Sequence, residues 1–308
     1  MFDVCIVGSF MMDLIVKTPR FPQPGETIAG HSLVTLPGGK GFNKAVAAAR
    51  AGAKASMLGC IGNDAFGKEF QEWMHKENIS SDGLKISTDA GTGVGLPMVN
   101  DDGQNAIVIV PQANLNFHES DVRNFAHVIE NSKTVVMELE IPDDANLAAA
   151  KIAHKAGATV ILNPAPFRPL SDALLQNISI LVPNETELEQ MAKNLGIEIG
   201  SIEAMAKAIK AKYNFDLIVT LGEEGALIVT DNNCVKVNGY TVNAIDTVGA
   251  GDTFIGNFAS NISRGVAITD AVELANAAAA LSVTRVGGAA ATPTVKELEE
   301  FRLTTVSK

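Results

Sequence analysis

Residues 246–254 read Asp-Thr-Val-Gly-Ala-Gly-Asp-Thr-Phe and lead directly into an apolar pattern of helical period. The small residues Gly249, Ala250 and Gly251 allow consecutive backbone N–H groups to converge at a helix N-terminus, where partial positive charge can hold an anion such as a phosphoryl group. Asp252 falls in the first turn, where it can take a proton from a hydroxyl that attacks phosphorus. The alternative is an Asp cap on an ordinary glycine-rich turn.

Around this segment, short apolar runs alternate with stretches of helical length. The runs are apolar on both faces, as a central parallel sheet demands, and they span 3–8, 55–62, 135–140, 159–163, 178–183 and 216–222. The helical stretches span 41–52, 65–77, 119–131, 143–156, 185–195, 201–213, 251–264 and 269–285. This alternation predicts an α/β fold in one domain, 1–308, with a doubly wound, mostly parallel sheet between helices, and we expect fraying after Phe301.

Two segments, about 13–38 and 92–112, break the alternation. The first carries β-type residues punctuated by prolines, and the second is typical of two strands around a turn at 100–103. Because neither segment is followed at once by a crossover helix, we expect a small antiparallel β lid that stands off the main sheet and closes over a site at the strand ends. A decorated edge hairpin without a gating role is the alternative.

Composition and charge limit the class of partner. The chain is 46% apolar and 19% charged, enough to bury a full core, and its formal net charge of −11 disfavours nucleic-acid and membrane surfaces. Three cysteines, Cys5, Cys60 and Cys234, lack C-x-x-C spacing and indicate buried thiols of a reducing compartment. The sequence shows no secretory signal pattern, so we expect a cytoplasmic protein with a small-molecule partner.

Residues 37–44 form a second glycine cluster, Pro-Gly-Gly-Lys-Gly-Phe-Asn-Lys. Bare backbone at Gly38 and Gly39 allows close approach of a polyhydroxy ligand, and the Asn43 amide can both donate to and accept from hydroxyls. The alternative is a tight turn into a closely packed Ala helix. The phosphate-loop spacing at 62–69 is rejected because Glu69 stands where a hydroxyl should bind Mg²⁺, and no strand ends in the G-x-G-x-x-G of dinucleotide-binding oxidoreductases.

Polar residues follow several of the predicted strands. They are Asp13, Glu140, Asn184 with Glu187, and Thr220 with Gly222. Open α/β sheets bind ligands beyond the carboxyl ends of their strands, so these residues are expected to converge with Asp252. Taken one at a time, each is a cap or turn residue by default.

Together these segments resemble the ribokinase family of ATP-dependent carbohydrate and nucleoside kinases over nearly the whole chain. The motifs that carry the resemblance are Gly38-Gly39-Lys40-Gly41 with Asn43, Asn184-Glu185-Thr186-Glu187, and residues 246–254. Residues 162–166, 183–187 and 284–287 are more similar to ribokinases than to fructokinases or adenosine kinases. The resemblance implies that the γ-phosphate of ATP is transferred to the 5-hydroxyl of a furanose pentose, D-ribose by default.

The resemblance also implies a role for each matching residue. Asp252 matches the catalytic base, and the anion hole matches Gly249, Ala250 and Gly251. Positions at the sugar match Met11, Asp13, Gly39, Lys40, Asn43 and Glu140. Nucleotide-site positions match Asn184, Glu187, Thr220, Gly222, Gly225 and Asn276, of which Asn184 and Glu187 organise Mg²⁺ through water. An activating K⁺ is implied at Asp246 and the carbonyls of Val248, Val283 and Gly288, and paired lids imply a homodimer.

Three residues depart from the family pattern. Ribokinases usually have Asn at the position of Met11, and a thioether cannot replace an amide's hydrogen bonds to the sugar. Phe42 and Lys44 replace the more usual small residue and Gln on either side of Asn43. Deoxyribokinases resemble this sequence in carrying Met, so 2-deoxy-D-ribose is an alternative substrate. A catalytically silent sugar- or nucleotide-binding regulator is the alternative of another class, and the intact Asp252 argues against it.

Overall fold

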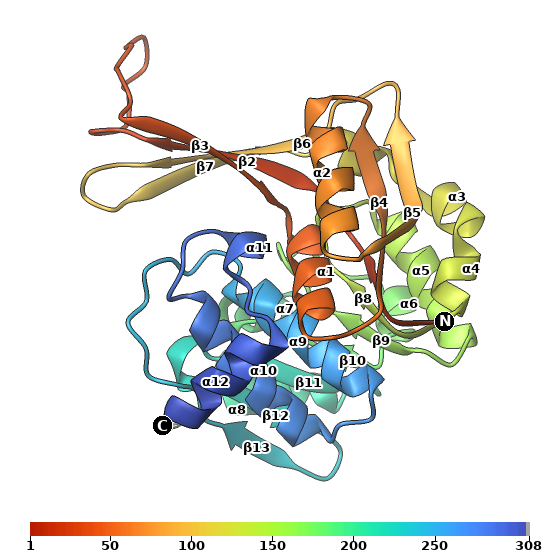
Figure 1. Ribbon diagram of the computed structural model, residues 1–308. Helices are drawn as coiled ribbons and strands as arrows, with labels where there is room; N and C mark the ends of the chain where they lie inside the picture. The colour runs from red at the N-terminus through yellow and green to blue at the C-terminus, as the bar shows by residue number, and fades with distance from the viewer. Residues whose placement is uncertain (306–308) are drawn as a thin grey trace.

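The computed structural model describes residues 1–305, and its largest feature is a mostly parallel sheet (Figure 1). The strands of this sheet are β1 (Phe2–Val7), β4 (Ala55–Gly62), β5 (Ser80–Ser87), β8 (Ser132–Met137), β9 (Thr159–Leu162), β10 (Ile180–Leu181), β11 (Asp216–Thr220), β12 (Ala226–Val229) and β13 (Cys234–Val237). Their order is β13-β12-β11-β10-β9-β8-β1-β4-β5. The strands from β11 to β5 pair in parallel, and β12 and β13 add an antiparallel edge.

Helices cover both faces of this sheet because its central strands are apolar on both sides. In β1, Val4 and Ile6 pack into one core and Cys5 and Val7 into the other. The first core is covered by α1 (Lys40–Arg50), α2 (Ala65–Lys76), α9 (Ala250–Ser263), α10 (Ile268–Ser282) and α11 (Gly288–Ala291). The second is covered by α3 (Glu119–Asn124), α4 (Ala126–Glu130), α5 (Asp143–Lys155), α6 (Asp172–Leu175), α7 (Glu185–Asn194) and α8 (Ile202–Lys210). The doubly wound α/β fold is therefore confirmed.

A second, four-stranded sheet extends from the body as an arm (Figure 1). It consists of β2 (Met11–Lys17), β3 (Ser32–Gly38), β6 (Gly93–Val99) and β7 (Asn105–Val110), in the order β3-β2-β6-β7. The pairs β2–β3 and β6–β7 are antiparallel hairpins, whereas the central pair β2–β6 is parallel. This pairing differs from a wholly antiparallel sheet because both hairpins begin at the body and run outward. The lid segments and the single-domain division stay predictions.

Several elements at the periphery have no counterpart in the sequence analysis. The missed strands, β5, β12 and β13, form the edges of the large sheet, and the stretch 119–131 is divided into α3 and α4 at Phe125. The last helix, α12 (Val295–Thr304), packs on α10 and continues beyond Phe301, where we expected fraying; residues 306–308 lie outside the described residues. Within residues 1–305, every helix is too short or too polar to cross a bilayer.

Candidate active site

Two adjoining cavities lie beyond the carboxyl ends of β10 and β11. The smaller, of about 180 Å³, is lined by predicted residues from four parts of the chain: Lys40, Asn184, Glu187, Thr220, Gly249, Ala250, Gly251 and Asp252. The larger, of about 510 Å³, shares Asn184, Thr220, Ala250 and Gly251 and adds Gly222, Gly225 and Asn276. The two cavities meet at the glycine-rich turn before α9, so the predicted phosphoryl-transfer and nucleotide positions converge.

Asp252 lies in the first turn of α9 and is 8% exposed. Asn43 Nδ2 donates to its Oδ2 over 2.9 Å, and Lys44 Nζ pairs with its Oδ1 at 2.5 Å. Consecutive residues of α1 therefore hold the two oxygens of one carboxylate. The N-cap of α9 is Gly249, at φ 76°, so Asp252 does not act as the cap that the alternative interpretation required.

The turn before α9 is built for close backbone approach. A β-carbon on Gly249 would lie 2.7 Å from Gly288 Cα, and its positive φ favours glycine as well. Ala250 N donates to Thr247 O at 3.3 Å, which closes the turn. The first turn of a fourteen-residue helix therefore faces the small cavity, where its partial positive charge favours an anion.

Glu140 and Glu138 form a carboxylate pair after β8. Glu140 Oε2 accepts from Ser9 Oγ at 2.6 Å and from Lys40 N at 3.1 Å. Glu138 is fully buried and accepts from Ser9 N at 2.9 Å and from Glu140 N at 2.8 Å. Burial and the charge of Glu140 raise the pKa of Glu138 to about 8, while Lys44 opposes this rise. Ser9 and Glu138 were not among the predicted site residues, although Glu138 lies two residues before the predicted ligand Glu140.

The Asp13 carboxylate occupies the space that β-carbons would fill on Gly38 of β3 and Gly95 of β6. These glycines of the second sheet therefore admit a charged group between three strands. Burial, with the charges of Glu140 and Asp252, raises the pKa of Asp13 to about 6, against a lowering by Lys40.

Met11 lies on the same face of β2 as Asp13, because side chains two residues apart on a strand share a face. Its neighbours across the sheet, Gly38 and Gly93, carry no side chains, and Met11 is 3% exposed. Its sulfur lies 4.0 Å from Asn114 Nδ2, an amide that also donates to Phe10 O at 2.8 Å. The Met11 thioether thus packs beside Gly93 and the Asn114 amide, on the same face of β2 as Asp13.

Asn43 carries an unpaired acceptor. It is 6% exposed, its Nδ2 is bonded to Asp252, and its buried Oδ1 finds no hydrogen-bond partner within residues 1–305. A buried amide oxygen without a partner is costly, and a hydroxyl is the kind of donor that would satisfy it. Gly39, the N-cap of α1 at φ 91°, lies against Met11 N and leaves the backbone bare beside this position.

The motifs at 38–43, 184–187 and 246–254 thus lie at one end of the sheet, and the model of the pfkB family of carbohydrate kinases matches residues 1–295. The chain belongs to this family. A ribokinase from Haemophilus influenzae is 36% identical over 96% of this pfkB-family chain and 97% of its own length. A deoxyribokinase from Salmonella typhi is 34% identical over 97% of this chain and 98% of its own. The resemblance inferred from the sequence is confirmed, and with it an ATP-dependent sugar kinase.

A solved structure supports the same assignment of fold. The ribokinase of Arabidopsis thaliana, complexed with ribose and ATP, superposes on this pfkB-family chain with a TM-score of 0.90 at 31% identity, covering 97% of each chain. The roles that we assigned to single residues stay predictions.

Among the residues predicted for the nucleotide site of this pfkB-family chain, Asn184 and Glu187 form a capping box. Glu187 N donates to Asn184 Oδ1 at 2.8 Å, and Asn184 N donates to Glu187 Oε2 at 2.9 Å. The cap interpretation therefore holds for this pair, and both residues also line the small cavity. Asn276 Nδ2 donates to Val237 O and Asn238 O, each at 3.2 Å, and so ties α10 to the end of β13.

The residues predicted to bind K⁺ lie in two loops that touch. Asp246 Oδ1 accepts from Val248 N at 3.0 Å, and its Oδ2 accepts from Gly287 N, the residue before Gly288, at 2.9 Å. Carboxylate and carbonyl oxygens suit K⁺, so the donor set fits this ion. The Val283 carbonyl already accepts two backbone N–H groups, at 2.7 and 3.2 Å, which makes it the weakest of the four predicted ligands.

Mg²⁺ fits the site in a different way. Across residues 1–305, no three His, Cys, Asp or Glu side chains are grouped to hold a metal. Mg²⁺ bound with nucleotides takes one or two protein carboxylates and keeps waters and phosphates as its other ligands. The Glu187 carboxylate, which lines the smaller cavity, fits this mode.

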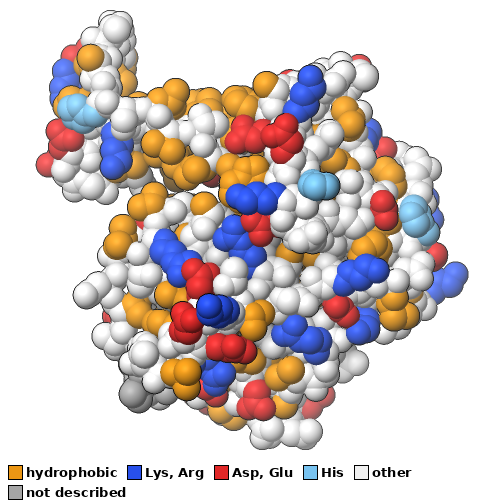
Figure 2. Space-filling model, in the orientation of Figure 1, with side chains coloured by type: hydrophobic (Ala, Val, Ile, Leu, Met, Phe, Trp, Pro, Cys, Tyr) orange, Lys and Arg blue, Asp and Glu red, His pale blue; other side chains and the backbone are white. Residues whose placement is uncertain are grey.

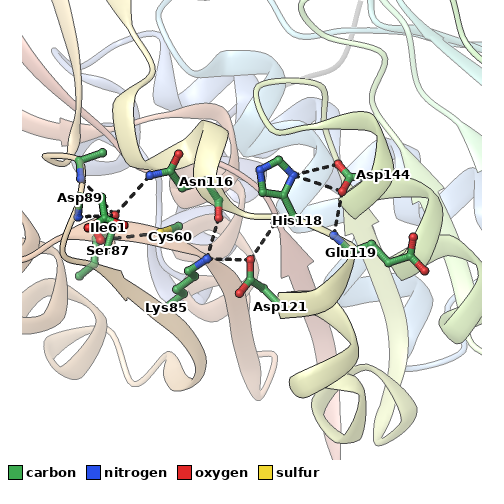
Figure 3. Close-up of polar contacts among 11 residues, drawn as sticks. Cys60, Ile61, Lys85, Ser87, Asp89, Asn116, His118, Glu119, Asp121 and Asp144 are labelled. Atoms are coloured by element: carbon green, nitrogen blue, oxygen red, sulfur yellow. Dashed lines mark hydrogen bonds and ion pairs between the residues drawn. The ribbon is translucent and has the colours of Figure 1, made fainter.

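A further polar network joins β5, α3 and α5 (Figure 3). Lys85 Nζ donates to Asn116 O at 2.7 Å and pairs with Asp121 Oδ2 at 2.8 Å. His118 Nδ1 lies 3.2 Å from Asp144 Oδ2. The residues drawn in Figure 3 include no predicted sugar or nucleotide ligand, so the network stabilises the packing of these elements.

Proposed function

We propose that this chain transfers the γ-phosphoryl group of ATP to the 5-hydroxyl of D-ribose in its furanose form. The observation that carries the proposal is Asp252, held by Asn43 and Lys44 beside the helix N-terminus where the two cavities meet. The ribokinase from Haemophilus influenzae and the ribose- and ATP-bound ribokinase structure support ribose as the acceptor.

The chemistry follows from this geometry. The acceptor hydroxyl gives its proton to Asp252, its oxygen forms a bond to the γ-phosphorus, and the bond from phosphorus to the β-phosphate oxygen breaks to release ADP. The N–H groups at 249–251 stabilise the negative charge of the transferring group. Asp13, Glu140 and the free Oδ1 of Asn43 orient the sugar, and this positioning supplies much of the acceleration.

Two cations belong to the proposal. Glu187 and Asn184 would hold Mg²⁺ through water, and the ion would supply positive charge against the phosphates. Asp246 and the carbonyls of Val248, Val283 and Gly288 would hold K⁺, which would supply positive charge beside the loop that carries Gly249. This chain contributes two loops that the Asp246 carboxylate joins: its Oδ1 accepts from Val248 N in one loop, and its Oδ2 accepts from Gly287 N in the other.

A second candidate substrate, 2-deoxy-D-ribose, is favoured by one observation. Met11 shares a face with Asp13 and is flanked by glycines, so its thioether borders the sugar position where ribokinases usually have an amide. The deoxyribokinase relative from Salmonella typhi supports the same alternative.

We also propose a homodimer through the lid. The second sheet exposes apolar side chains that lie along the projecting arm (Figure 2), among them Leu33, Val34, Leu96, Ile107, Val108, Ile109 and Val110. These side chains are shared between the two faces of the arm and lie mostly on its two outer strands, and exposed apolar side chains gathered in one segment are typical of a protein interface. The cytoplasmic location and the absence of nucleic-acid and membrane partners stay predictions.

The test is an ADP-release assay with ribose, 2-deoxyribose, fructose and adenosine, each with and without K⁺. We expect ribose or 2-deoxyribose to give the highest kcat/KM, and the Asp252→Asn variant to serve as the inactive control. If fructose or adenosine gives the highest kcat/KM, the pentose assignment is contradicted. If none of the four compounds stimulates ADP release, the proposed acceptor class is contradicted.

A further inference from the structure

The side chain of Lys44 is fully buried between α1 and α9. Its Nζ lies 2.5 Å from Asp252 Oδ1 and 3.3 Å from the carbonyl oxygen of Lys40. Lysine is almost never fully buried unless it is paired, because an uncompensated ammonium is costly out of water. Its place in the interior therefore depends on the carboxylate of Asp252.

The helices that carry this pair touch one turn further along. A β-carbon on Gly256 of α9 would lie 2.5 Å from the Lys44 carbonyl oxygen and 2.5 Å from Ala47 Cβ. The absence of a side chain at Gly256 thus lets α1 approach α9 closely enough for the lysine to reach Asp252. The contact fixes the distance between the sugar-binding start of α1 and the start of α9.

The carboxylate of Asp252 is held from two directions. Lys44 contacts Oδ1 with a full positive charge, and Asn43 contacts Oδ2 with a neutral amide. Each contact takes up one lone pair of its oxygen, so the carboxylate keeps a lone pair for an acceptor hydroxyl. Rotation of the carboxylate about its own axis would break both contacts at once.

Lys44 also faces a second buried acid. Its charge lowers the pKa of Glu138, the fully buried residue that holds Ser9 N and Glu140 N. Lys40, Glu140, Asp13 and Glu187 are the other charged groups around this cluster. Lys44 is thus paired with Asp252 by direct contact, and its charge also opposes the rise in the pKa of Glu138.

We propose that Lys44 is a positioning residue for phosphoryl transfer, whose charge holds Asp252 in the orientation that accepts the proton of the sugar hydroxyl. The inference deepens the proposed function and rests on the role of Asp252 in it. Lys44 does not touch the reacting atoms, and it acts through Asp252. A Gln at this position, the residue more usual in ribokinases, would supply a hydrogen bond without the charge.

The experiment compares Lys44→Gln and Lys44→Met, each alone and combined with Asp252→Asn. We expect Lys44→Met to lower kcat for the better pentose about ten-fold or more with KM changed less than about three-fold, and Lys44→Gln to fall between it and the parent chain. In the Asp252→Asn background the same substitutions should change kcat less than about two-fold, because residues that act as a unit are not additive. Long incubations at high enzyme concentration make the slow turnover measurable.

The matched control is Lys210→Gln. Lys210 is also a buried lysine, with its Nζ 2.6 Å from Asp231 Oδ1, and it is absent from the linings of the two site cavities. It should lower the melting temperature and leave kcat within about two-fold of the parent chain.

Three results separate the possibilities. A normal kcat in Lys44→Gln and Lys44→Met would overturn the proposal, and if Lys44→Met does not fold, a normal kcat in Lys44→Gln alone is enough. Full additivity with Asp252→Asn would also overturn it, since Lys44 would then act elsewhere. A nearly normal kcat in Asp252→Asn itself would instead refute the proposed role of Asp252.

Discussion

The amide N–H of Asn43 donates to Asp252 across the interface of α1 and α9, and the buried oxygen of the same amide has no hydrogen-bond partner among residues 1–305. The amide lies against the backbone of Gly288, so one side chain links the proposed base on α9 to the start of α11.

The Asp252→Asn variant should lose about 10²-fold or more in kcat, because it removes a general base. It also leaves the ammonium of Lys44 buried without a counter-charge, so its free energy of unfolding should fall by about 3 kcal/mol. Adding Lys44→Gln should restore the melting temperature without restoring kcat. Steady-state kinetics and thermal denaturation measure both effects, and a kcat near that of the parent chain would show that Asp252 is not the base.

From the raised pKa of Asp13 we predict how kcat/KM for the sugar depends on pH. Its pKa is raised to about 6, mainly by burial and by the charges of Glu140 and Asp252, so it becomes ionised above that pH. Only the ionised carboxylate accepts from two sugar hydroxyls, so kcat/KM for the sugar should fall as the pH drops below about 6. A constant kcat/KM from about pH 5 to 8 would contradict this role.

The stability effect of the same residue has the opposite sign. A carboxyl whose pKa is raised by folding stabilises the native state when it is protonated, and this contribution is lost as the pH rises through about 6. Asp13→Asn should therefore raise the melting temperature at pH 8 while it weakens sugar binding. Differential scanning calorimetry of the two chains at pH 5 and pH 8 provides the comparison, and equal differences at both values would disagree with it.

From the position of Met11 we predict which of the two pentoses is preferred. Since its side chain lies on the face of Asp13, a 2-hydroxyl against the thioether would lack a partner, which costs about 1–3 kcal/mol. If the Met11 side chain faces C2 of the sugar, the ratio of kcat/KM for 2-deoxyribose to that for ribose should be near or above unity in the parent chain, whereas a Met11 that points away from C2 leaves ribose as the better substrate. In the first case Met11→Asn should shift the ratio toward ribose by about ten-fold or more. If competition between the two sugars gives the same ratio for both proteins, Met11 does not set specificity.

From the two loops joined by Asp246 we predict that K⁺ activates the enzyme. The ion should raise kcat with little change in KM for the sugar, because it neutralises Asp246 and orders the turn at Gly249 without touching the substrate. Asp246→Asn should abolish the difference between K⁺ and Na⁺. Equal kcat of the parent chain in K⁺, Na⁺ and a large organic cation would remove the cation from the mechanism.

From the exposed apolar side chains of the arm we predict a dimer. Ile107 is 56% exposed on β7, and Ile107→Asp should convert a dimer to a monomer in light scattering after size-exclusion chromatography. Leu303→Asp, at an 87% exposed position of α12, is the control that should leave the dimer intact. A parent chain that is monomeric at high concentration would contradict the lid interface.

What the sequence could predict depended on burial. Most inner strands of the large sheet were evident because both of their faces are apolar, whereas β5, with Asp82 and Lys85, and β13, with Lys236, are polar edge strands without that pattern. The strand β12 departs from this rule, since its four residues are apolar and buried and it was still missed. The parallel pairing of β2 with β6 follows from how two hairpins leave the body, which no local pattern encodes.

The same distinction holds for the site. Residues in glycine-rich motifs or at strand ends could be located by their position in the chain. The pairing of Lys44 with Asp252 could not, because 208 residues separate the partners and neither motif indicates which residue of the other it contacts. Glu138 was missed for a related reason, since a buried acid at the end of a strand carries no signal until its partners, Ser9 and Lys44, are placed around it.

The missing side chain at Gly256 has a consequence for motion. With the backbone of α1 in contact with α9 at this point, the two helices cannot slide past each other without a clash, so the acceptor pocket and the proton acceptor travel as one rigid block. Closure of the predicted lid would then need bending of the second sheet where the chain passes between the body and the arm, at residues 8–10, 38–40, 88–92 and 110–112.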